Sequence, residues 1–332
     1  MTASSRRAFL RRAVFMGVAS GVVPLLGACT AAAPREGSGQ VRLVRVGMLG
    51  GGTGSPDFEG LVDGLRDLGY AEGRNLVIER RFTAGRPDLL PAAAADLVRL
   101  GVDAIVVSGP APARVAKSES GTIPILTSRA WIESGIMDSY TRPGGNITGI
   151  DGDPEDLEGK RLEVFKEVVP SISHVAVLGS NITAVERPLQ DAALLLGLQL
   201  TVLPLPSPEA LEPAFQATIA SRADGLYVRS GGIQAAAQER IVEFAAERRL
   251  PAVYEIRRFV EGGGLLLYGV NGRDVFRRLA VYVDKILRGA KPGELPVERP
   301  TAYDLVINLK AAQGLGLVIP PAVLARATEV IR

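Results

Sequence analysis

A run of glycines and hydroxyl side chains, Gly50 to Ser55, lies between an apolar segment at 44–49 and an amphipathic segment that starts at Pro56. A glycine-rich turn between a strand and a helix exposes backbone N–H groups at the positive end of the helix, which suits an anion. The run lacks the third glycine of a dinucleotide fingerprint, and no phosphate-binding lysine follows it. It therefore predicts an anion site that a carboxylate can fill, with a dinucleotide cofactor as the alternative.

His174 is the only histidine of the chain, and Cys29 is its only cysteine. No Gly-x-Ser-x-Gly elbow accompanies the histidine, and the two residues do not supply the usual ligands of a zinc ion. A single cysteine also forms no internal disulfide. We expect His174 to lie at a strand edge or on the surface, and we predict no catalytic residue, no metal and no resident cofactor.

The first 28 residues have the pattern of an export signal. Four arginines (Arg6, Arg7, Arg11 and Arg12) precede an apolar run at 13–28. That run is shorter than the about 20 residues that cross a bilayer, and it ends in Leu-Gly-Ala-Cys, which resembles a lipobox. We predict a twin-arginine, lipoprotein-type signal peptide over 1–28, lipidation at Cys29 and a flexible tether over 29–41. An uncleaved anchor helix is the alternative.

Removal of the predicted signal peptide changes the charge balance of the chain. The 38 basic side chains lose four arginines, which leaves 34 against 36 acidic side chains and a net charge of −2. A protein that binds the phosphate backbone needs a basic patch or stripe instead. We therefore expect no nucleic acid as a partner.

Apolar segments typical of buried strands alternate with amphipathic segments of helical spacing from Val44 onward. One such series spans 44–150 and a second spans 157–254. Strands that alternate with helices build parallel sheets that are covered on both faces. The sequence therefore predicts an α/β protein of two doubly wound parallel-sheet lobes, while the later segments at 265–268, 275–287 and 305–308 leave the order of the lobes open.

Residues Gly64–Asn75 read GLRDLGYAEGRN and resemble the "GLRELGYVEGRN" signature of a family of ABC-transporter substrate-binding proteins. Better-known members of that family bind tryptophan or tyrosine. Further motifs follow in the family's order at Val102–Gly109, Thr122–Ile125, Arg142–Gly149, Gly159–Glu163, Arg249–Tyr254, Val260–Gly264 and Tyr282–Pro292. The resemblance covers nearly the whole chain after the tether.

The resemblance implies a type I periplasmic-binding fold, with two lobes, three crossing segments and a ligand cleft between the lobes. The first lobe is expected to contain 42–151 and about 270–304, and the second 152–269 and about 305–332. Ligands of open α/β sheets bind beyond the carboxyl ends of the strands. The ligand-binding residues predicted there are Thr53, Gly54, Ser55, Ser108, Gly109, Ala111, Ser128, Arg129, Trp131, Ser180, Asn181, Arg229, Ser230 and Tyr254.

Two acidic positions of the family are lost in this chain. Ala130 stands where members usually have the aspartate of a "GDPVGSGLV" run, and Gly231 stands in a segment where they often have "DP". Arg129 and Arg229 lie next to these positions and favour a small carboxylate-bearing ligand. We then expect Arg229→Ala to weaken binding while leaving the melting temperature nearly unchanged. The alternative is that both arginines face solvent or pair across the lobes.

Together, the export signal, the resemblance and the two arginines predict an extracytoplasmic lipoprotein of an ABC importer that captures a carboxylate-bearing or amino-acid-like ligand by lobe closure. The expected partners are a small molecule, an ABC permease subunit and, through the lipid anchor, the membrane. We expect a monomer in the bacterial cell envelope, facing the periplasm or the exterior. Two alternatives are an exported Rossmann-type oxidoreductase and a ligand sensor without a transport role.

Overall fold

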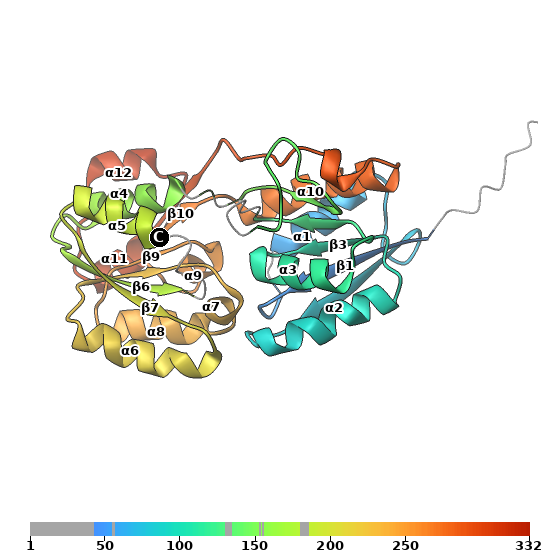
Figure 1. Cartoon of the computed structure of the whole chain (residues 1–332). Coiled ribbons are helices and arrows are strands. Elements are labelled where there is room, and N and C mark those ends of the chain that lie inside the picture. Colours follow the sequence, from blue (N-terminus) through green and yellow to red (C-terminus); the bar gives the residue numbers. More distant parts are fainter. Residues whose placement is uncertain (1–42, 55–56, 130–134, 153, 155, 180–185) are drawn as a thin grey trace, which may run out of the picture. The chain divides into compact units, whose positions relative to one another are not determined.

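Two open sheets, each covered by helices on both faces, make up the folded part of the chain in a computed structural model (Figure 1). The structure describes residues 43–54, 57–129, 135–152, 154, 156–179 and 186–332. Within these residues the alternation of strands and helices that the sequence predicts is present, and the α/β fold class is confirmed.

The first sheet has five parallel strands in the order β2-β1-β3-β4-β5. They are β1 (Val44–Gly50), β2 (Leu76–Phe82), β3 (Ala104–Val107), β4 (Ile125–Thr127) and β5 (Ile147–Gly149). Helices α2 (Leu90–Arg99) and α3 (Pro110–Glu119) cover one face, and α1 (Asp57–Asp67) and α10 (Gly272–Leu287) cover the other. Every residue of β3 is buried, as expected for a strand with helices on both sides.

The second sheet has seven strands in the order β12-β11-β10-β9-β8-β6-β7. They are β6 (His174–Gly179), β7 (Gln199–Pro204), β8 (Gly225–Val228), β9 (Ala252–Tyr254), β10 (Leu266–Gly269), β11 (Asp304–Asn308) and β12 (Glu329–Ile331). One face carries α4 (Asp156–Val168), α5 (Glu186–Leu195), α11 (Leu309–Gly314) and α12 (Pro321–Arg326). The other face carries α6 (Leu211–Ala220), α7 (Gly232–Ala236), α8 (Gln238–Glu247) and α9 (Arg257–Glu261).

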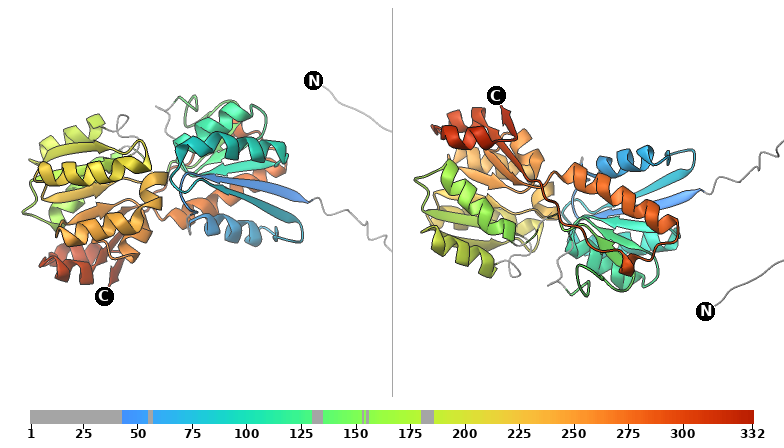
Figure 2. Two further views of the ribbon diagram at one scale, coloured as in Figure 1. Left: turned by 90° about the horizontal axis from the view of Figure 1, so that it is seen from below. Right: turned by 90° about the horizontal axis from the view of Figure 1, so that it is seen from above.

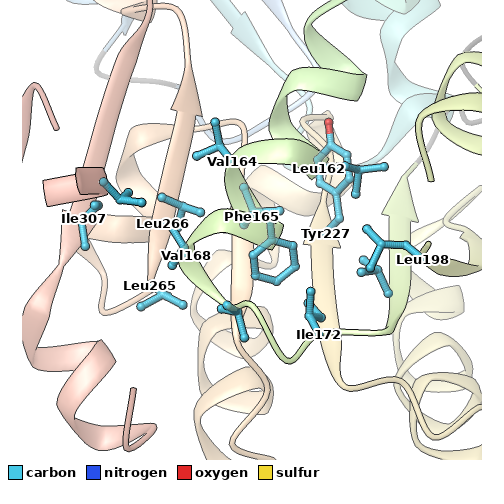
Figure 3. Packing of buried hydrophobic residues seen from close by; sticks show 14 of the residues in the cluster. Leu162, Val164, Phe165, Val168, Ile172, Leu198, Tyr227, Leu265, Leu266 and Ile307 are labelled. Atoms are coloured by element: carbon cyan, nitrogen blue, oxygen red, sulfur yellow. The ribbon is translucent and has the colours of Figure 1, made fainter. Parts of the chain in front are cut away.

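The core under α4 illustrates how this packing is built. Leu162, Phe165 and Val168 of α4 gather with Tyr227 of β8 and Leu266 of β10 (Figure 3). The three helical residues are spaced by three, so they lie on one face of the helix. Burial of such apolar side chains is the main favourable contribution to folding.

Helix α10 lies far along the sequence but packs beside α1 on the first sheet (Figure 2). Gly60 and Gly64 of α1 make this approach possible. A Cβ atom at Gly60 would overlap the carbonyl oxygen of Arg273, and one at Gly64 would lie 2.7 Å from the Cβ of Ala280. The chain therefore returns from the second sheet to cover the first.

Gly60→Ala is expected to lower the free energy of unfolding by about 1–3 kcal/mol, because the new methyl group forces the backbones of α1 and α10 apart. This value is the net change, after subtraction of the about 1 kcal/mol that alanine gains over glycine in helix propensity. Urea denaturation measures the change. Glu59→Ala, on the exposed neighbouring position, should change stability by less than about 0.5 kcal/mol. Equal effects of the two substitutions would contradict the close packing.

One strand pair departs from the expected parallel arrangement. β11 runs antiparallel to β10, with Leu266 opposite Ile307. The chain leaves β10, passes through α10 on the first sheet, and re-enters the second sheet at the end where β10 finished. This reversal agrees with the lobe boundaries that we propose at about 270 and 304.

Candidate functional site

Strands of both sheets end around a cavity of about 430 Å³. Its wall contains residues that directly follow β1, β3 and β4 of the first sheet, and β8, β9 and β10 of the second. Crevices beyond the carboxyl ends of strands are where open α/β sheets bind ligands. The volume lies within the about 300–1,000 Å³ that is typical of small-molecule sites.

Most residues predicted from the sequence as ligand-binding lie on the wall of this cavity. Eight of them line it: Thr53, Gly54, Ser108, Ala111, Ser128, Arg129, Arg229 and Ser230. Gly109 is not among the lining residues; it precedes α3 with a φ of 115°, a backbone conformation that favours glycine. Ser55, Trp131, Ser180, Asn181 and the lipidation candidate Cys29 lie outside the described residues.

Tyr254 is also absent from the wall, since its side chain points into the core of the second sheet. It is only 1% exposed, and its ring stacks on Phe259 at a centroid distance of 4.9 Å. Alternate residues of a strand face opposite sides of the sheet, so the neighbouring Glu255 reaches the wall instead.

Three aromatic side chains contribute to the apolar part of the wall. Phe58 of α1, Phe82 of β2 and Phe276 of α10 all line the cavity. The Phe58 ring lies 5.1 Å from that of Phe82 and 4.4 Å from that of Phe276, measured between centroids. Phe58 and Phe276 are buried, whereas Phe82 is half-buried. Phe82 is not among the site residues predicted from the sequence, although its position at the carboxyl end of a strand was a signal.

The glycine-rich turn after β1 packs against the second sheet's α7. A Cβ atom at Gly232 would lie 2.5 Å from the carbonyl carbon of Gly51, and one at Gly52 would lie 3.3 Å from the Cβ of Ala235. The glycines are therefore required for a close approach of two backbone segments. This explains the glycine run without a pyrophosphate.

Arg229 belongs to a buried ion-pair network on the second sheet's side of the cavity. Its Nη2 lies 2.7 Å from Oε1 of Glu158, and its Nε lies 3.6 Å from Oε1 of Glu255. Arg161 pairs with the same Glu255 oxygen at 3.2 Å. The Tyr227 hydroxyl lies within hydrogen-bond distance of both carboxylates. All four charged side chains are at most 2% exposed.

The network keeps Glu255 ionised. Burial alone raises the pKa of its carboxyl, but the charges of Arg161, Arg229 and Arg129 and the N–H of Ser230 outweigh burial and hold the pKa well below its ordinary value. A carboxyl whose pKa is lower in the folded than in the unfolded state stabilises the fold at neutral pH, and that stabilisation is lost as the pH falls through the folded-state pKa. Burial raises the pKa of the Tyr227 phenol well above its ordinary value, so this group stays neutral.

Arg129 links this network to the first sheet. It follows β4, and its Nη2 lies 3.3 Å from Oε2 of Glu255. Its side chain is 18% exposed, compared with 0% for Glu255. Both arginines predicted from the sequence thus lie on the cavity wall and both pair with carboxylates. Glu158, which pairs with Arg229, and Arg161, which pairs with Glu255, were not predicted from the sequence. Each of them is distant in sequence from that partner.

His174 lies away from this cavity. It opens β6, and its Nε2 lies 2.8 Å from Oγ1 of Thr201 on the neighbouring strand. In the described part of the chain, no group of three or more histidine, cysteine or carboxylate side chains is placed to hold a metal ion. None of the helices described is both long and apolar enough to cross a membrane.

Several known proteins are similar to this chain in sequence or in fold. The "Tyrosine-binding protein" of Clostridioides difficile (strain R20291) is 21% identical over 266 residues, which cover 78% of this chain and 76% of the relative. A solved structure of a conserved domain protein from Vibrio cholerae is 28% identical with a TM-score of 0.80, over 87% of this chain and 100% of that one. An ABC domain from Streptococcus pneumonia in complex with L-Trp is 23% identical with a TM-score of 0.79, over 87% and 99% of the two chains.

The match to a protein family is equally extensive. Residues 54–331 match the family described as ABC transporter substrate binding protein. This range contains both sheets apart from β1, and all the described residues that we assign to the cavity wall after Thr53. The family resemblance inferred from Gly64–Asn75 and the later motifs is confirmed. The chain belongs to the ABC transporter substrate-binding protein family.

Proposed function

We propose that the chain is an exported lipoprotein that captures a small carboxylate-bearing or amino-acid-like molecule and delivers it to an ABC importer. The observation that carries this proposal is the cavity at which strands of both sheets end, because a ligand there contacts both halves of the fold. A ligand that contacts both sides favours the conformation in which they lie together. Capture is therefore proposed to proceed by lobe closure.

The wall of the cavity favours a ligand with an apolar group and a negative charge. The half-buried ring of Phe82 offers a surface for an apolar or aromatic group. Arg129 carries positive charge at the partly exposed end of the buried network. Relatives named for tyrosine binding or solved with L-Trp support a ligand of amino-acid size.

A thermal-shift screen of the purified protein tests the proposal. Amino acids, aromatic carboxylates, sugars and organic cations are compared at equal concentration. A ligand at 100 times its Kd adds about 2.7 kcal/mol to the free energy of unfolding, which raises the melting temperature by several degrees. We expect such a shift from a carboxylate or an amino acid. A shift produced by sugars or cations alone would contradict the proposal.

Anchoring is proposed to depend on Cys29, which follows the predicted signal peptide. A lipoprotein with two or more acyl chains is held stably at a membrane, whereas one chain gives marginal binding. We expect the wild-type protein to sediment with the membrane fraction and to incorporate a labelled fatty acid. Cys29→Ser should abolish the label. A wild-type protein without label would contradict the anchoring.

A further inference from the structure

We propose that Arg114 selects the charge of the ligand, and that the preferred ligands are net anions: carboxylates with an apolar ring or chain and without a compensating ammonium group. This inference rests on the proposed function, because it assumes that the cavity binds a small molecule. Arg114 lies on the second turn of α3 and lines the cavity. No motif or strand end in the sequence marks this position.

Arg114 differs from the other arginines on the wall, which have partners. Arg129 pairs with Glu255 and Arg229 with Glu158. Two more arginines of the wall, at the start of α9, contact Glu261 and Glu329 or the side chain of Gln238. Arg114 is exposed and forms no hydrogen bond or ion pair within the described residues. Its guanidinium is therefore available to an anion in the cavity.

The backbone at the start of α3 supplies few donors, so the side chain has to take that role. Pro110 and Pro112 have no N–H group, and the N–H of Ala113 donates to the carbonyl of Gly109 at 3.1 Å. Ala111 of this first turn lines the cavity, and its N–H is one of those at a helix start that have no partner within the helix. Helical side chains generally lean toward the preceding turn, and both Arg114 and Ala111 line the cavity.

The described wall contains two carboxylates, Glu255 and Asp57, and both already interact with groups of the protein. Glu255 Oε2 accepts hydrogen bonds from the N–H and the hydroxyl of Ser230 at 2.7 and 2.8 Å, in addition to its ion pairs. The Asp57 carboxylate lies against Gly272, where α10 begins, and a negative charge is stabilised at such a helix end. A ligand ammonium group gains little from either carboxylate, while the arginines of the described wall outnumber them.

The positive charge of Arg114 and the apolar surface of Phe82 lie on different elements of the first lobe. Arg114 extends from α3, whereas Phe82 ends β2 and packs on Phe58 of α1. A molecule that spans both contacts carries its negative charge at one end and its apolar group at the other. Such amphipathic carboxylates share the skeleton of aromatic amino acids but lack the ammonium group.

Matched ligand pairs test this inference by isothermal titration calorimetry on the purified protein. The pairs are 3-phenylpropanoate with L-phenylalanine and indole-3-propanoate with L-tryptophan, which differ only in the ammonium group. We expect at least one propanoate to bind at least tenfold more tightly than its amino acid. Arg114→Ala should raise the Kd of that propanoate at least tenfold, because a charge-assisted hydrogen bond between the guanidinium and the carboxylate is lost. Arg114→Lys should recover part of the affinity.

Arg187→Ala is the matched control, since Arg187 is an exposed helical arginine that does not line the cavity. It should leave the affinity within twofold of the wild type. Tighter binding of the amino acids, or an Arg114→Ala protein with wild-type affinity for the propanoates, would overturn the inference while preserving the proposed function. Absence of binding by either member of both pairs, together with no response in the thermal-shift screen, would overturn the proposed function itself.

Discussion

Arg229→Ala is expected to lower the free energy of unfolding by about 3–5 kcal/mol, since it leaves buried carboxylates without their partner. Arg229 is 2% exposed and its Nη2 lies 2.7 Å from Glu158 Oε1. The sequence suggested a cleft arginine whose loss would leave the melting temperature nearly unchanged. The structure changes that expectation, because the guanidinium is buried and paired, and we therefore expect its removal to affect folding before it affects binding.

Urea denaturation measures this change, with Arg240→Ala as the control. Arg240 also pairs with a glutamate, Glu212, at 3.0 Å, but both side chains are more than half exposed. Exposed ion pairs contribute about 0–1 kcal/mol, so the control should change stability little. Equal losses for Arg229→Ala and Arg240→Ala would show that the network is not buried as the structure describes.

Gly232→Ala is expected to weaken ligand binding at least tenfold while leaving the stability of each sheet's core intact. A Cβ atom at Gly232 would lie 2.5 Å from the carbonyl carbon of Gly51 and 2.6 Å from its oxygen. Backbone atoms cannot yield as a flexible side chain does, so α7 and the Gly50–Gly54 turn must separate. The ligand then loses simultaneous contact with both walls of the cavity.

Calorimetry measures the affinity, and small-angle scattering of the ligand-saturated protein measures the radius of gyration. We expect Gly232→Ala to have the larger radius of the two proteins at saturating ligand. Gly314→Ala is the control, because nothing lies within 4 Å of a Cβ atom at that position. An unchanged affinity for Gly232→Ala would contradict a role for this contact in ligand capture.

Local patterns in the sequence predicted the elements of the fold well. The apolar residues of 44–49 and the stripe Phe58, Leu61 and Leu65 identify β1 and the buried face of α1. Val275, Leu279 and Tyr282 identify the buried face of α10 in the same way. Each of these predictions depends on residues within a few positions of one another, which periodicity captures.

Such local patterns did not predict which segments distant in sequence pack together in the fold. Periodicity carries no strand direction, so the antiparallel β10–β11 pair was not foreseen. It also does not reveal that Gly60 and Gly64 meet α10. The family motifs supplied what periodicity lacked, because they imply crossing segments and a cleft.

The site was predicted in its location and only partly in its chemistry. The rule that ligands bind beyond the carboxyl ends of strands located Ser108, Ser128 and Arg129 on the wall. It did not distinguish a cleft-facing side chain from one that turns into the core, as Tyr254 does. Nor did it show which arginine already has a partner, since Arg229 and Glu158 are distant in sequence and meet only in the folded chain.

The most direct test of the central claim is a crystal structure of the protein grown with the tightest-binding ligand from the matched pairs. We predict ligand density in the cavity that Phe82 and Arg114 line, with the apolar group against Phe82 and the carboxylate toward Arg114. A ligand of confirmed affinity that lies elsewhere on the protein, with this cavity filled only by water, would contradict the account.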